Sequence, residues 1–165
     1  MAVDIFLLLS NGIKGESQDA THMDNIDVLS WSWGMTQSGT THMGGGGGAG
    51  KVDVGDIVLT KYVDLSSNDL IKRCASGEHI DDGELIVRKS GGGAPVEYFK
   101  IKMSNIMISS YETGGSKDGL DRIQETLKLN FRRFEVTYTM QDEAGTAGAE
   151  SLAGWDIAAN EEWAA

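Results

Sequence analysis

The chain has 165 residues, a formal charge of -11 at pH 7, and 22 glycines against one proline. Its size fits one domain over residues 1–165, because a chain of this length buries enough surface to form a core without cross-links. The acidic balance argues against nucleic acid or anionic membranes as partners, since their affinity rests on neutralising phosphates. Cys74 is the single cysteine, which excludes an internal disulfide and a multi-thiolate zinc site.

The apolar run near the amino end predicts a strand and no membrane insertion. Ile5–Leu9 is only five residues long, far too short to cross a bilayer. It follows Asp4 with no basic segment of the kind that opens a secretory signal. We therefore expect a strand over Val3–Leu9 that is covered on both faces. Any export of the protein is expected to use a route that reads no signal peptide.

Alternating apolar residues separated by glycine-rich turns predict a fold that is mainly β. In the two longest apolar segments the phase of the alternation changes, near Ser104-Asn105 and near Arg132-Arg133, which predicts bulges. Long bulged strands bend sheets, so a barrel or a rolled sandwich is expected. The expected strands are Val3–Leu9, Ile26–Thr36, 52–62, Leu85–Lys89, Glu97–Ser110, Asp121–Gln141 and a short one at Gly154–Ile157.

One short helix is expected at about residues 66–76. Ser66, Ser67 and Asn68 can cap its start, and Gly77 can end it. The helix would carry a short apolar stripe made of Leu70, Ile71, Cys74 and Ala75.

A long extended glycine-rich loop, about 38–51, is the most unusual segment. Gly45 to Lys51 fits the G-x-x-x-x-G-K pattern of a phosphate-binding loop, but Val52 replaces the magnesium-binding hydroxyl. A strand, not a helix, is predicted to follow, so nucleotide binding is disfavoured. A loop of this length is costly to order unless it is used. We expect it to dock on a partner protein.

No catalytic constellation stands out. His22, His42 and His79 lack metal-ligand spacing, and the carboxylate pairs Asp81-Asp82 and Glu161-Glu162 fit solvated turns. We therefore expect no enzyme activity, no catalytic residue, no metal site and no cofactor.

The Ile26–Thr36 segment has two different predicted faces. Trp31 and Trp33 alternate with small residues, and core packing is the favoured interpretation over a sugar-binding platform. Ser30 and Ser32 lie on the opposite, small face. On a monomer this is a solvent face; in a ring it would suit the smooth wall of a channel.

The whole chain resembles the haemolysin-coregulated protein (Hcp) family, whose members build the tube of bacterial type VI secretion. The resemblance rests on motifs that occur in order along nearly the full length: Met1–Phe6, Gly15-Glu16-Ser17, Thr21-His22, Ile26–Leu29, Trp31–Gly34, Met43–Val52, Thr60–Asp64, Cys74–Gly77, Val87–Lys89, Val96–Tyr98, Leu129–Phe131 and Gly154-Trp155.

The resemblance implies a rolled or closed β-barrel of two packed sheets, with one short helix and an extended loop. It also implies a homo-hexameric ring that stacks into a tube inside a contractile sheath, beneath a spike. Sheath contraction would expel the tube from the bacterial cytoplasm with small effector proteins in its lumen. The lumen-facing candidates are Ser30 and Ser32. The candidates for the inter-subunit or ring-stacking loop are Thr40, His42, Met43, Gly44, Gly45, Gly46, Gly47, Gly48 and Lys51.

A different class of function stays open from the residues alone. A monomeric, lectin-like β-sandwich that binds a ligand would present Trp31 or Trp33 to solvent, whereas a tube subunit would bury them.

Overall fold

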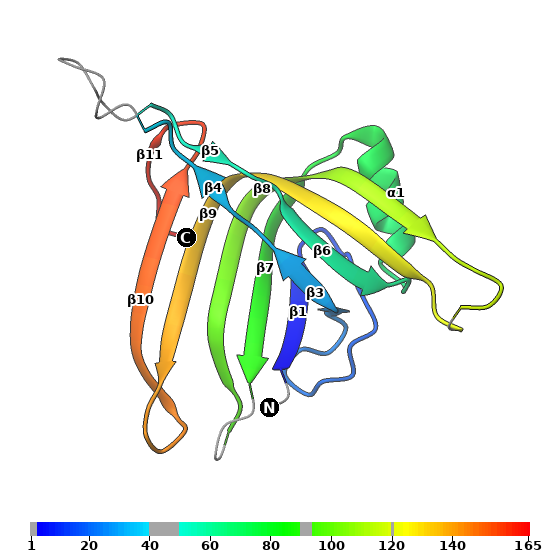
Figure 1. The fold of residues 1–165 in the computed structure, drawn as a ribbon, viewed down its shortest axis with the longest axis horizontal. Coiled ribbons are helices and arrows are strands. Elements are labelled where there is room, and N and C mark those ends of the chain that lie inside the picture. Colours follow the sequence, from blue (N-terminus) through cyan, green and yellow to red (C-terminus); the bar gives the residue numbers. More distant parts are fainter. Residues whose placement is uncertain (1–2, 40–49, 90–93, 120) are drawn as a thin grey trace.

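The computed structural model describes residues 3–39, 50–89, 94–119 and 121–165. It is an all-β fold with one short helix, as predicted (Figure 1). The elements in chain order are β1 (Val3–Leu9), β2 (Ile26–Asp27), β3 (Ser30–Ser32), β4 (Met35–Thr36), β5 (Asp53–Val54), β6 (Ile57–Tyr62), α1 (Ser67–Ser76), β7 (Ile80–Lys89), β8 (Val96–Gly114), β9 (Gln124–Gln141), β10 (Ala147–Asp156) and β11 (Glu161–Glu162).

The main sheet runs in the order β11-β10-β9-β8-β7-β1-β2, and β6 joins it on β9, with β3 on β6. Every strand pair is antiparallel. The carboxyl-terminal half of β9 pairs with β10 and its amino-terminal half with β6, while β8 follows β9 along its length. The sheet is thus rolled around a shared pair of strands. The continuous segment of β2 and β3 bonds β1 at its start and β6 at its end, through the Val28 N–H to the Ile5 carbonyl and the Leu29 N–H to the Thr60 carbonyl. It thus spans the two sides of the roll, as the predicted rolled β fold requires, although the strand ladders themselves do not form a closed ring among the described strands.

The rolling depends on a change of face in the middle of β8. Asn105 has a left-handed backbone, φ 56°, which asparagine tolerates better than most residues. Met103 before it and Ile106 after it are both buried against β9. The phase change predicted near Ser104-Asn105 therefore exists, but the pairing register continues across it. The register shift lies further on, between Ile108 and Ser110.

The Ile26–Thr36 segment is not the single long strand that its alternation predicted. It breaks into β2, β3 and β4, because each piece pairs with a different strand: β1, β6 and β5. The tryptophans nevertheless pack on the core, as predicted. Trp31 stacks on Phe99 with ring centroids 5.6 Å apart, and Trp33 meets Phe134 edge-on at 5.0 Å.

The first strand is covered less completely than predicted. Leu7 and Leu9 are buried in the core, and Phe6 is buried on the opposite face. Leu8, on the same side as Phe6, is 45% exposed. His22 stacks on Phe6 with centroids 4.6 Å apart, so the long connection after β1 covers only part of that outer face.

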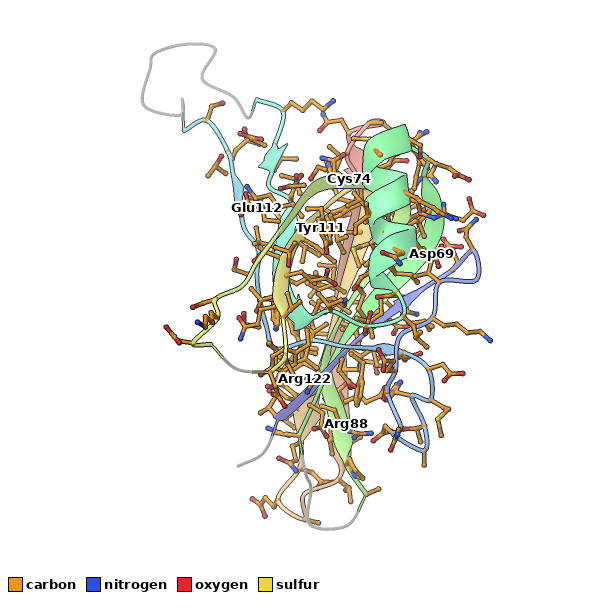
Figure 2. The ribbon with its side chains drawn as sticks, turned by 90° about the vertical axis from the view of Figure 1, so that its right-hand side faces the viewer. Asp69, Cys74, Arg88, Tyr111, Glu112 and Arg122 are labelled. Atoms are coloured by element: carbon orange, nitrogen blue, oxygen red, sulfur yellow. The ribbon has the colours of Figure 1, made fainter. Side chains whose placement is uncertain are left out.

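The helix begins and ends almost as expected. Gly77 has φ 72° and donates its N–H to the Arg73 carbonyl at 2.9 Å, a left-handed stop that favours glycine. Of the predicted apolar stripe, Leu70 is fully buried while Ile71 is 40% exposed. Cys74 packs partly against the core from the sheet-facing side of the helix (Figure 2).

Residues 161–165 fold back over β10. Trp163 donates its backbone N–H to the Gly154 carbonyl at 3.3 Å, and a side chain at Gly154 would collide with the Trp163 carbonyl. Ala165 donates its backbone N–H to Glu135 Oε2 at 2.8 Å. A glycine at position 154 is what allows this close crossing.

Asp156, the last residue of β10, bonds to Arg132 and Arg133 in the middle of β9. Its carboxylate accepts hydrogen bonds from Arg133 Nε at 2.8 Å, Arg132 Nε at 3.3 Å and the Ala159 N–H at 3.0 Å. The Ala159 N–H and the two guanidinium groups hold the pKa of Asp156 well below its usual range.

Replacing Asp156 by asparagine is expected to lower the free energy of unfolding most above about pH 5, where the carboxylate is ionised in both states. As the pH falls through the unfolded-state pKa, the unfolded chain takes up the proton first, so the wild type loses this advantage. Urea unfolding of D156N and the wild type between pH 7 and pH 2.5 checks this. The exposed Glu161→Gln serves as control, with changes within about 0.5 kcal/mol. A difference that stays constant with pH would contradict the assignment.

Candidate functional site: a polar sheet face and the arms of a glycine-rich loop

One side of the rolled sheet is lined by short polar side chains. Ser30 and Ser32 are both exposed and lie directly opposite Thr60 and Val58 in the β3–β6 ladder. The Ser30 and Thr60 hydroxyls share a hydrogen bond of 2.6 Å. We call this surface the polar face; its central residues are Ser30, Ser32, Val58, Thr60, Thr126 and Lys128.

At the margin of the polar face beside β8, a carboxylate holds neighbouring polar side chains by hydrogen bonds. Asp56, just before β6, accepts hydrogen bonds from Ser109 Oγ at 2.5 Å and from Asn130 Nδ2 at 2.9 Å. Ser109 lies at the register shift in β8, so the bulged residue turns its hydroxyl toward Asp56. At this margin the Asp56 carboxylate therefore bonds within the chain.

The other margin carries larger, charged groups. The Arg122 guanidinium lies 3.8 Å from the centroid of the Tyr62 ring. Glu112 is exposed on β8 directly opposite Thr126 of the polar face. Figure 2 shows Glu112 and Arg122 on the side of the molecule away from α1.

Beneath the polar face, on the inward side of the same strands, lies a buried ionic network. Lys61 is fully buried and its ammonium pairs with Glu125, with Asp64 Oδ1 at 3.0 Å and with Ser67 Oγ at 3.3 Å. Ser67 Oγ also donates to Glu125 Oε1 at 2.7 Å, and Tyr111 OH donates to the second Glu125 oxygen. Burial and the neighbouring Glu125 carboxylate raise the pKa of Tyr111 to about 12.

This network fastens α1 to the sheet that carries the polar face. Asp64 accepts the backbone N–H of Ser66 at 2.9 Å, while Ser67 supplies the bond into Glu125. The predicted caps are therefore only partly right: Ser66 forms no side-chain cap. Asp64 organises the start of the helix, and Ser67 is buried beneath it.

The arms of the glycine-rich loop continue directly from the polar face. Met35 pairs with Val54 and Thr36 with Asp53, which makes β4 and β5 a separate two-stranded sheet (Figure 1). Among the loop residues predicted for contacts, Lys51 is described and exposed. Thr40, His42, Met43, Gly44, Gly45, Gly46, Gly47 and Gly48 lie outside the described residues. The element after Lys51 is a strand, as the argument against a phosphate-binding loop expected.

The other residues considered for chemistry are placed in local contacts. His22 bonds Glu97 Oε1 at 2.5 Å and Asn25 Nδ2 at 3.1 Å, and His79 contacts Asn105. Across the four described stretches, no group of three or more His, Cys, Asp or Glu side chains is arranged to hold a metal. In the same stretches, no helix is long and apolar enough to cross a membrane.

Sequence reasoning identified the serines of the polar face but missed the groups that hold it. Lys61 follows Ile57 and Leu59, and Glu125 precedes Leu127 and Leu129, each at the inward phase of its strand. A charged residue at an inward position on two paired strands was a signal for a buried ion pair.

Comparison with known proteins identifies the family. A family model described as "Type VI secretion system effector, Hcp" matches residues 6–138. The Protein hcp1 of Pseudomonas aeruginosa is 48% identical over 161 residues, which cover 97% of this chain and 98% of that protein. The crystal structure of Hcp1 from Salmonella typhimurium superposes with a TM-score of 0.81 at 38% identity, covering 99% and 100% of the two chains. A further structure of a type six secretion system protein gives a TM-score of 0.90 at 29% identity, covering 98% and 100%.

The rolled all-β fold and these matches define a structural component of a secretion machine rather than an enzyme. The chain belongs to the Hcp family and is a tube protein of type VI secretion.

The buried network under the polar face gives a stability test. Lys61→Met leaves Glu125 buried without its cation and is expected to cost about 3–5 kcal/mol in the free energy of unfolding. The double change Lys61→Met/Glu125→Gln removes both charges and is expected to recover part of that loss. Urea unfolding of the two single variants and the double variant at pH 7 checks this. Additive losses would mean that the two residues are not coupled.

Proposed function

We propose that this protein forms hexameric rings that stack into the inner tube of a type VI secretion system and carry small effector proteins in the lumen. The tube would assemble in the bacterial cytoplasm beneath a spike and leave the cell when the surrounding sheath contracts. Family membership supports this assembly. The polar face is the observation on this chain that carries it.

The polar face has the properties that a channel wall needs. Its serines and threonines are short and uncharged, and the Ser30–Thr60 hydrogen bond keeps two hydroxyls flat against the strands. Such a wall offers a passing protein many weak polar contacts and no deep apolar site. Ser32 is exposed at its centre, with Val58 opposite it.

The glycine-rich loop is proposed to contact a neighbouring subunit or the next ring. Its arms, β4 and β5, are paired with each other and not with the main sheet. The Gly55 N–H bonds the Gly34 carbonyl at 2.9 Å at the base of the arms. Lys51, exposed near the end of one arm, provides a cation in a strongly acidic chain.

The alternative, a monomeric lectin-like module, would require Trp31 or Trp33 to be presented to solvent. Trp31 and Trp33 are half-buried and pack on Phe99 and Phe134, which favours core packing over an exposed sugar platform.

Native mass spectrometry of the purified protein, with negative-stain images of the same sample, tests the assembly. We expect a species of about 106 kDa, six times 17.7 kDa, with ring views. A variant that lacks Gly44–Gly48 should still form rings but should stack poorly, since the loop would no longer reach the next ring. A monomer at every concentration would overturn the proposed ring, and unchanged tube length in the deletion would overturn the role of the loop.

Replacing Ser32 by phenylalanine tests the lumen assignment. A bulky apolar ring on the polar face is expected to reduce effector retention several-fold while ring mass stays unchanged. The measurement is the amount of effector that co-purifies with rings and reaches the medium. Met23→Phe, at an exposed position in the connection after β1, is the matched control. Equal effector yield from both variants would show that Ser32 does not face the cargo.

A further inference from the structure

Strand β10, at the rim of the main sheet, leaves most of one edge without a partner (Figure 1). Its other edge pairs with β9. On the free side, β11 pairs only with Trp155 and Asp156, at the end of the strand. Residues 147–153 are all exposed and have no further partner among the described strands. We call residues 147–153 the free edge.

The backbone bonds around the end of β10 show which of its residues point to the free side. The Ile157 N–H donates to the Arg132 carbonyl of β9 at 2.9 Å. The Gly154 carbonyl instead accepts the N–H of Trp163, in the segment 161–165 that folds back over β10, at 3.3 Å. Consecutive residues of an antiparallel strand direct their backbone groups to alternate sides. The even-numbered residues of β10 from 150 to 154 therefore point to the free side.

Glu150 and Leu152 thus carry backbone N–H and C=O groups that face no strand among the described residues. Proteins usually block such an edge with a lysine, a proline or a bulge. The free edge contains no lysine and no proline, and its register shift lies at its start, between Ala147 and Glu150. The remaining stretch has none of these protections, so it can accept an added strand.

A hollow of about 540 Å³ lies along the same edge. Its lining comes from Leu152, Ala153, Gly154 and Trp155 of β10 and from Glu162, Trp163 and Ala164 of the returning segment. Leu152 is 56% exposed there. Strand addition takes its affinity from backbone bonds and its specificity from pockets for alternate side chains. The hollow provides such a pocket for one apolar side chain of an added strand.

The charge around the free edge favours a basic occupant. Residues 141–165 hold six acidic and no basic residues. Glu150 lies on the free edge, with Glu143 before it and Glu162 in the returning segment, and all three are exposed. Among the described residues, none of the three forms an ion pair. Basic side chains on an added strand would complement these carboxylates, whereas an acidic strand, including a second copy of this edge, would be repelled.

We propose that the free edge of β10 binds an extended, basic segment of a partner protein by strand addition. The added strand pairs with the backbone of Glu150 and Leu152, places an apolar side chain in the hollow, and sets basic side chains beside Glu150 and Glu162. The inference does not rest on the proposed hexamer, because every group of the site comes from one chain.

A short synthetic peptide of alternating lysine and valine, blocked at both ends, is the probe. Isothermal titration calorimetry should show binding that weakens several-fold as salt is raised, since part of the attraction is between charges. The same peptide N-methylated at every residue keeps its charges but loses its backbone donors, and it should not bind. A peptide with glutamate in place of lysine should not bind either.

Three results of these titrations would overturn the proposal. Failure of the lysine–valine peptide to bind the wild type would remove the site. Equal binding of the N-methylated peptide would show a contact between charges without strand addition. Equal binding of the glutamate peptide would show that the occupant is not basic.

Variants of the free edge locate the binding. Leu152→Pro removes an N–H that points away from β9, so the variant should keep the β9 ladder and lose the peptide. Leu152→Ala keeps this N–H and is its control. Glu150→Lys should weaken binding several-fold, whereas Glu112→Lys, the same charge change at the margin of the polar face, should not. Unchanged affinity in both Leu152→Pro and Glu150→Lys would overturn the assignment to this edge.

Native mass spectrometry of the peptide complex separates this proposal from the proposed function. Peptide bound to the subunits of intact rings supports a site that is free in the assembly. Peptide on monomers alone would show that a neighbouring copy uses the edge, and would overturn the basic partner. Specific binding by a protein that never forms rings would overturn the hexamer and leave the free edge as a binding site.

Discussion

Full-length pairing of β8 with β9 is the constraint on which the rest of the structure depends. Both strands change their buried face together, at Asn105 and its neighbour Arg132, while the register continues. One pair of strands can therefore serve two sheets: β7 and β10 flank one half, and β6 flanks the other. The polar face and the buried ionic network lie on one half, and the exposed apolar side chains of Tyr138 and Met140 lie on the other.

Local sequence patterns predicted those elements whose structure does not depend on which strand lies beside them. The apolar run in Val3–Leu9 and the glycine at position 77 each determine a local structure, and the strand and the helix end are both present. Ile26–Thr36 shows why this fails elsewhere. Its alternation is real, and Trp31 and Trp33 do reach the core, but three different partner strands divide it. Alternation with a period of two residues indicates which face of a strand is buried, but it does not indicate which strand pairs with it.

The candidate site likewise contains residues that the sequence could identify and residues that it could not. Ser30 and Ser32 could be found because they alternate with tryptophans within one segment. Asp56, Ser109 and Asn130 could not, since they come from three segments that meet only after the sheet rolls. The buried ionic network could be predicted in part from the sequence. A lysine and a glutamate at inward positions of separate strands indicate that each needs a counter-charge, but only the β6–β9 register shows that they meet.

The two exposed surfaces of the sheet differ in how far their side chains already find partners within the chain. On the polar face the Ser30 and Thr60 hydroxyls bond each other and the Asp56 carboxylate bonds Ser109 and Asn130, so these groups gain little by binding a partner. The carboxyl-terminal half of β9 leaves the apolar groups of Tyr138 and Met140 exposed, so it loses less free energy where those groups are covered. In a chain with a formal charge of -11, copies repel at long range. Apolar burial acts only at contact and is not screened by salt, so the proposed ring would depend on it.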